Sequence, residues 1–182
     1  MQSLKQTLIA QVIRAEGGYS NDPSDRGGET MYGITKAVAR ENGYTGPMAD
    51  LSFNVAFALY EKRYWQPLKL DHIASYHDDL AVQLFDFGVH SGITKAGKTL
   101  QQVLNVLNQQ QTLYSDLTAD GIVGSKTLEA LKLFYQHRQK QGLVVLFQAI
   151  KSKRMSFCID IALSDQTQER YQYGWLKRIV NL

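Results

Sequence analysis

The stretch EGGYSNDPSDRGGETMYGIT, residues 16–35, decides how the first part of this chain folds. Before it, LKQTLIAQVIRAE carries apolar residues at three- and four-residue spacing, which predicts an amphipathic helix. Ser3 and Gln6 fit a capping box at the start of this helix, and Gly17 stands where a left-handed residue commonly ends one. We therefore expect a helix that ends at Glu16, followed by a glycine-rich loop or a small β-hairpin.

Glu16 is a candidate catalytic acid. It lies three residues after Ile13 and four after Val12, so we expect its side chain to share their apolar face. Burial there would disfavour the charged form, and a carboxyl group that keeps its proton can act as a general acid. A structural glutamate paired with Arg14 is the alternative. Against it, the helix dipole disfavours a carboxylate at a C-terminus, so its placement there points to another role.

The loop after the helix supplies candidates for a second catalytic group. Asp22, Asp25, Glu29 and Thr30 would share a cleft with Glu16 if the loop folds back. A glycoside hydrolase needs such a layout, in which one protonated carboxyl donates to the leaving oxygen and a second group handles a water. Asp22 lies within Asn-Asp-Pro, which is typical of a turn, so a structural role is favoured there. Asp25 and Glu29 remain open alternatives.

These residues resemble the signature of the glycoside hydrolase family 108 muramidases, which include phage endolysins and bacterial secretion activators. The resemblance implies a lysozyme-like, mainly α-helical fold that cleaves the β-1,4 bond between N-acetylmuramic acid and N-acetylglucosamine in peptidoglycan. Glu16 stands at the position of the family's catalytic glutamate. The resemblance continues in order through EKRYW (61–65), FDFGVHSG (85–92), LQQVLN (100–105), DGIVGSKTLEAL (120–131) and GWLKR (174–178).

A more distant resemblance, to phage-type lysozymes, bears on the second catalytic group. Eight residues separate Glu16 from Asp25, as in those enzymes, whereas Thr30 follows Asp25 after four residues instead of five. The resemblance implies that Asp25 and Thr30 position the attacking water. Glu29 remains a rival for this role.

Several side chains are candidates for binding the sugar rings. Tyr19, Tyr32 and Trp65 each offer an apolar ring face with a polar edge, although Trp65 suits the core equally well. His90 and Ser91 follow an apolar segment, which suggests a position at the edge of a cleft. They also lie in the one departure from the family pattern, since this chain has VHSG where VNSG is expected, so a substrate contact differs there.

The rest of the chain reads as helices. The segment 78–89 is apolar at most positions and predicts a central buried helix. The segment DGIVG before Ser125 resembles a turn of small peptidoglycan-binding modules, although turn chemistry alone also explains it. We expect one compact unit over 1–182, with a catalytic part of about 1–115 and a peptidoglycan-binding-like helical part of about 116–182 packed on it. Helices are expected over 35–42, 52–64, 78–89, 94–108, 125–141, 143–162 and 168–181.

Composition argues against several classes of protein. The chain has 182 residues, 44% of them hydrophobic and 20% charged, which suits one substantial core. Its net charge is +3, and basic residues gather only at 151–154, which we interpret as a solvated face, so no nucleic acid partner is expected. No apolar run approaches about 20 residues, so stable membrane insertion is not expected. Cys158 stands alone and predicts a buried thiol. His72 and His77 lack metal-ligand spacing, so neither a metal nor a cofactor is expected.

The N-terminal segment bears on where the protein acts. It lacks the basic start of a secretory signal and carries Glu16 itself. We expect a monomer made in the bacterial cytoplasm that reaches periplasmic peptidoglycan after release, through a holin or another export partner. Two other functions fit the same residues: a lytic transglycosylase, and a non-catalytic cell-wall-binding or secretion-accessory protein.

Overall fold

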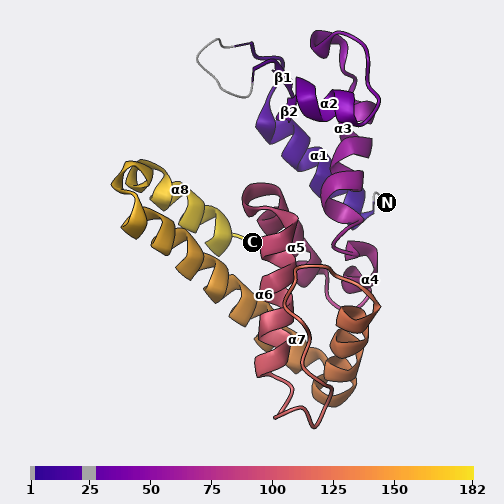
Figure 1. The fold of residues 1–182 in the computed structure, drawn as a ribbon, viewed down its shortest axis with the longest axis vertical. Coiled ribbons are helices and arrows are strands. Elements are labelled where there is room, and N and C mark those ends of the chain that lie inside the picture. Colours follow the sequence, from indigo (N-terminus) through magenta and orange to yellow (C-terminus); the bar gives the residue numbers. More distant parts are fainter. Residues whose placement is uncertain (1–2, 22–27) are drawn as a thin grey trace. The chain divides into compact units, whose positions relative to one another are not determined.

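The structure, a computed structural model, describes residues 3–21 and 28–182 and is mainly α-helical (Figure 1). These residues form eight α-helices and one two-stranded antiparallel sheet. The mainly α class expected from the sequence, with a small hairpin after the first helix, is confirmed. The chain divides into two compact units, residues 1–66 and residues 67–182. No helix within the described ranges is long and apolar enough to cross a membrane.

Two packed helices form the base of the first unit, α1 (Leu4–Glu16) and α3 (Phe53–Tyr60). The predicted capping box of α1 is confirmed, because the Ser3 hydroxyl accepts from the Gln6 amide and the Gln6 side chain accepts from the Ser3 amide. A π-helical turn (Glu61–Trp65) continues α3, where the sequence predicted one helix over 52–64. The face of α1 that packs inward carries Ile9, Val12 and Ile13.

A short hairpin follows the loop after α1. Its strands are β1 (Thr30–Met31) and β2 (Ile34–Thr35), which pair antiparallel. The two turn residues, Tyr32 and Gly33, both have positive φ values, 55° and 71°, as a type I′ turn requires. Helix α2 (Lys36–Glu41) begins directly after β2, and a 3₁₀ turn (Met48–Asp50) precedes α3. The hairpin is therefore fixed in register by its turn and by the helix that leaves it.

The second unit is arranged around α5 (Asp78–Ser91), which packs against α4 (Leu70–Ala74), α6 (Ile93–Val106) and α7 (Ser125–Ser164). The central, buried position expected for residues 78–89 is confirmed. A 3₁₀ turn (Gln166–Gln168) leads into α8 (Glu169–Val180), which packs back along α7 (Figure 1).

Three features of this unit differ from the expected elements. Residues 125–164 carry the single label α7 but form two helices, as expected, and these meet at a kink at Gln139 (φ 55°) instead of at residue 142. Helix α4 was not predicted, because five residues are too few to show a helical period. A serine after a turn commonly caps a helix, so Ser125 was expected at the cap position of α7, but Gly124 occupies it.

Removing residues 120–182 tests whether the C-terminal helices are separable. Helices α5 and α6 pack on α7 within the second unit, so truncation would expose their apolar faces to water. We expect the fragment 1–119 to be insoluble or to unfold without a cooperative transition. A soluble fragment with a sharp thermal transition and retained lytic activity would show two independent domains. The single-unit organisation remains a prediction until this is measured.

Candidate active site

Glu16 is the last residue of α1 and lies against the hairpin turn. A methyl group added at Gly33 would stand 2.8 Å from Glu16 Oε2 and 3.0 Å from the Tyr60 hydroxyl. The absence of a side chain at Gly33 therefore lets the carboxylate approach the turn. The end of α1, the hairpin turn and the end of α3 meet at this carboxylate.

The side chain of Glu16 is exposed, so the expected burial beside Val12 and Ile13 is wrong. Those two residues are buried in the packed part of α1. The helix stops at Glu16, and Gly17 turns the chain with a φ of 84°. The apolar cover over the preceding turn does not extend to the final residue.

Tyr60 supports the turn from the side of α3. Its hydroxyl donates to the Tyr32 carbonyl oxygen at 3.0 Å, and its side chain is almost fully buried. Burial, followed by the nearby charge of Glu16 and the neighbouring Tyr64, raises the pKa of Tyr60 well above its usual value. Tyr60 is thus a neutral hydrogen-bond donor beside the carboxylate. Tyr60 is not among the site residues predicted from the sequence.

Tyr32 has an unusual backbone conformation for a large side chain. Its φ of 55° lies in the left-handed region, which costs a residue other than glycine about 1–3 kcal/mol. Its ring meets Phe53 edge-on at a centroid distance of 6.2 Å. The backbone conformation and the contact with Phe53 together set the position of the Tyr32 ring. This ring therefore lies at the turn whose Gly33 is close to Glu16.

Glu29 is held by two neighbours. Lys36 Nζ donates to its Oε2 at 2.7 Å, and the Tyr19 hydroxyl donates to its Oε1 at 3.0 Å. The bond from Lys36, and then the bond from Tyr19, lower the pKa of Glu29 below its usual value. The same hydrogen bond, in which Tyr19 is the donor, raises the pKa of Tyr19. Glu29 is therefore a fixed anion whose two oxygens are both engaged, which is a poor arrangement for donating a proton.

Thr30, Asp22 and Asp25 are the other candidates of the loop. Thr30 is half-buried and exchanges two backbone hydrogen bonds with Ser20, at 3.0 and 2.9 Å. Asp22 and Asp25 lie outside the described residues. Trp65 is only 1% exposed. Its ring belongs to the core, so we leave it out of the proposed sugar-binding residues.

His90 and Ser91 lie in the second unit, at the end of α5. Together with Arg154, Trp175 and Arg178 they line a pocket of about 290 Å³ between α5, α7 and α8. We call this cavity the α8 pocket. His90 Nε2 is 3.5 Å from Asp86 Oδ1, one turn earlier on the same helix.

Asp86 is a buried carboxylate that joins three helices of the second unit. Arg154 of α7 donates to its Oδ2, and Arg178 of α8 donates through Nε to its Oδ1 at 2.8 Å. Burial alone would raise the pKa of Asp86, but bonds from His90 and Arg178 and the charge of Arg154 outweigh burial and hold that pKa far below its usual range. Arg154 is 3% exposed, so the solvated face expected for residues 151–154 is wrong at this position.

Within the described part of the chain, no group of three or more histidine, cysteine or acidic side chains could hold a metal ion. His77 caps α5 instead, since its Nδ1 accepts from the Leu80 amide at 3.2 Å, while His72 lies in α4. Cys158 is buried, as expected.

Two protein-family models match consecutive parts of the chain. Residues 9–92 match the family model described as Glycosyl hydrolase 108, and residues 95–180 match that of a Predicted Peptidoglycan domain. The second match begins well before residue 116. A solved structure titled "Structure of Brucella abortus SagA" is 25% identical with a TM-score of 0.66, and the match covers 97% of this chain and 90% of that one. No curated protein matches the chain.

Proposed function

Because this chain belongs to the glycosyl hydrolase 108 family and carries a predicted peptidoglycan domain, we propose that it is an N-acetylmuramidase with Glu16 as its general acid. The two matched domains together make it a peptidoglycan hydrolase, and hence a glycoside hydrolase. The finer proposal is that the bond cleaved is the β-1,4 bond between N-acetylmuramic acid and N-acetylglucosamine. No cofactor is needed for this reaction.

The proposed reaction uses one proton and one water. Protonated Glu16 donates to the glycosidic oxygen as the bond from that oxygen to the muramic acid C1 breaks. Water then adds to C1 and releases a proton, which leaves a reducing end on the muramic acid. Asp25 and Thr30 are proposed to position this water.

The observation that carries the proposal is the contact of Glu16 with the hairpin turn. The carboxylate stands at a helix end where Gly33 gives it room and where buried Tyr60 anchors the turn. The closeness of the turn supports the proposal, because a general acid must lie at a defined place beside its substrate. Tyr19, which is 45% exposed, and Tyr32 are proposed to contact the sugar rings.

Gly33→Ala tests whether the room beside Glu16 matters. Gly33 and Gly43 both have left-handed φ values, 71° and 87°, so alanine costs each variant about 1–2 kcal/mol of stability. A methyl group at Gly33 would meet Glu16, whereas nothing lies within 4 Å of one at Gly43. We expect Gly33→Ala to lose on the order of 100-fold in turnover and Gly43→Ala to stay near the parent rate. Equal rates for two folded variants would contradict this role of Gly33.

A series of loop variants tests the second catalytic group. If Asp25 positions the water, Asp25→Asn will cost more turnover than Asp22→Asn, with Thr30→Val between them. Glu29→Gln should cost less than Asp25→Asn, because Glu29 is already engaged by Lys36 and Tyr19. Initial rates on purified peptidoglycan measure all four. If Glu29→Gln is the most damaging change, the assignment of Asp25 is wrong while that of Glu16 stands.

A lytic transglycosylase is the second candidate. Such an enzyme needs one carboxyl group and closes an anhydro ring on the muramic acid without adding water. The observation in its favour is that both oxygens of Glu29 are engaged. A non-catalytic cell-wall-binding or secretion-accessory role would leave peptidoglycan uncut.

The release of new ends from purified peptidoglycan tests the proposed activity. The full chain should produce reducing ends in proportion to time and to protein concentration, and no release would support the non-catalytic role. We further propose that a monomeric chain meets its substrate in the periplasm after release by a holin or another export partner. Size-exclusion chromatography and fractionation of expressing cells check these two points.

A further inference from the structure

The α8 pocket is a built cavity that the proposed hydrolysis does not use. Its volume of about 290 Å³ lies near the lower end of the range for small-ligand sites. It is formed within the second unit, where residues 95–180 match the predicted peptidoglycan domain. Its polar lining comes from Arg154 and Arg178, with His90 and Ser91 at the end of α5.

The charges around this pocket do not balance. Arg154 and Arg178 share the single carboxylate of Asp86, and no acidic side chain of the described residues lines the pocket. Only 3% of Arg154 is exposed to solvent. Its Nε and Nη1 have no hydrogen-bond partner within the described part of the chain. A buried cation that is only partly compensated favours an anion nearby.

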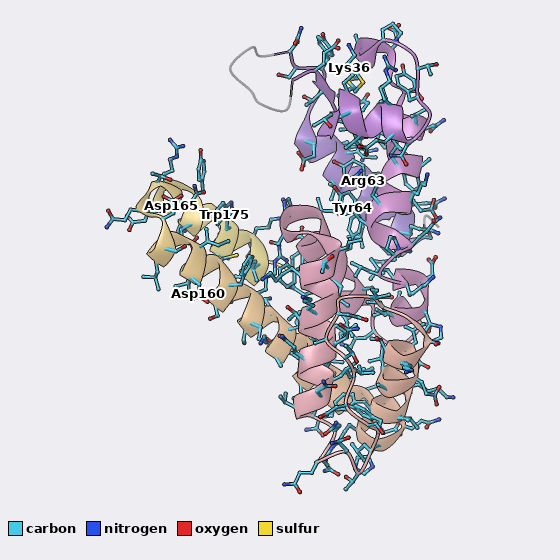
Figure 2. The ribbon with its side chains drawn as sticks, in the orientation of Figure 1. Lys36, Arg63, Tyr64, Asp160, Asp165 and Trp175 are labelled. Carbon is cyan, nitrogen blue, oxygen red and sulfur yellow. The ribbon has the colours of Figure 1, made fainter. Side chains whose placement is uncertain are left out.

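The remaining lining is apolar and includes an aromatic ring. Trp175 of α8, labelled in Figure 2, lines the pocket and stacks on Tyr171 at a centroid distance of 5.9 Å. Ile161 and Ile179 complete this side. Arg178 keeps 39% of its side chain exposed, so its guanidinium is accessible to a ligand. An aromatic wall beside an accessible guanidinium suits a sugar or peptide that carries a carboxylate.

We propose that the α8 pocket binds a carboxylate group of peptidoglycan, with Arg178 as the direct partner, Arg154 as the charge behind it and Trp175 as the apolar wall. This inference rests on the proposed function, because it takes peptidoglycan as the ligand. Peptidoglycan contains carboxylates of two kinds. One is the lactyl carboxylate of a muramic acid that carries no peptide, and the other is a carboxylate of the peptide stem.

Binding of three small ligands to the full chain tests the proposal and separates the two sources. The ligands are N-acetylglucosaminyl-N-acetylmuramic acid, the same disaccharide with a peptide stem, and neutral diacetylchitobiose. We expect at least one acidic ligand to bind about tenfold tighter than diacetylchitobiose, as one charge-assisted hydrogen bond would provide. Titration calorimetry gives the affinities. Because the chain also contains Trp65, quenching of fluorescence that is lost in Trp175→Phe reports the location. The tighter of the two acidic ligands identifies the source of the carboxylate.

Two variants assign the preference to this pocket. Arg178→Gln should abolish the preference for the acidic ligand, whereas Lys177→Gln, an exposed neighbour on α8, should keep it. Ser91→Leu, which fills the pocket and keeps both arginines, should also abolish binding if thermal unfolding shows a folded chain. Equal affinity for all three ligands, no binding, or a preference unchanged in both pocket variants would overturn the inference. If hydrolysis is observed but the acidic ligands do not bind, the inference about the α8 pocket is wrong and the proposed hydrolase function stands. If the acidic ligands bind but no hydrolysis is observed, the proposed hydrolase function is wrong and the inference about the pocket stands.

Discussion

Replacing Glu16 with glutamine lowers the rate of peptidoglycan cleavage by about 10²–10⁴-fold and leaves the chain folded. The amide is nearly isosteric with the carboxyl group but has no acidic proton to donate. Glu16 is exposed at the end of α1, so the exchange removes no core contact and should change stability little. Initial rates and thermal unfolding of the purified variant measure the two effects separately.

Glu41→Gln is the matched control for this experiment. Glu41 is also an exposed glutamate at the last position of a helix in the first unit. Its replacement changes the net charge equally and should leave the rate near that of the parent chain. A folded Glu16→Gln variant with near-parent turnover would remove Glu16 from the proposed mechanism.

Replacing Asp86 with asparagine destabilises the second unit by about 3–5 kcal/mol, the usual cost of removing one partner from a buried ion pair. Arg154 is 3% exposed and would lose Asp86, its carboxylate partner among the described residues. The Arg178 pair contributes less, since that side chain is 39% exposed. Chemical denaturation gives the free energy of unfolding.

Asp160→Asn is the same exchange at an exposed position of α7 and should change the free energy of unfolding by no more than about 0.5 kcal/mol. If the two variants lose similar amounts, Asp86 does not anchor the three helices. The comparison is made at neutral pH, where the Asp86 carboxylate is fully ionised.

The Asp86 network also predicts an acid dependence of stability. The folded pKa of Asp86 is lowered, so its contribution is fully present above the unfolded value of about 3.9. This contribution is lost as the pH falls below about 4 toward the lower folded pKa. The parent chain should lose stability over this range, and Asp86→Asn should lose less. Denaturation at several pH values checks the difference.

The sequence predicted those features that depend on neighbouring residues. The capping box of Ser3 and Gln6, the end of α1 at Glu16 and the hairpin before residue 36 all follow from local patterns. The burial of Glu16 was predicted wrongly, because helical spacing assigns a face but does not show where the covering elements stop. The contact with Gly33 depends on the turn geometry, in which even Tyr32 has a positive φ.

The Asp86 network was not predicted, because it joins residues far apart in the chain. Arg154 lies 68 positions after Asp86, and Arg178 lies 92 positions after it. A single acidic residue between Phe85 and Phe87 in an apolar helix was the available signal, since an isolated buried charge requires a partner. Which of the distant arginines supplies it depends on how α7 and α8 pack.

The analysis of products by mass spectrometry tests the central claim most directly. Peptidoglycan is digested by the full chain in water enriched in heavy oxygen, and the new muramic acid ends are reduced at once and weighed. Hydrolysis predicts reducing N-acetylmuramic acid ends that carry one heavy oxygen, and about 10²–10⁴-fold slower formation of these ends with Glu16→Gln. Anhydro ends without heavy oxygen, new ends on N-acetylglucosamine, or no new ends would contradict the account.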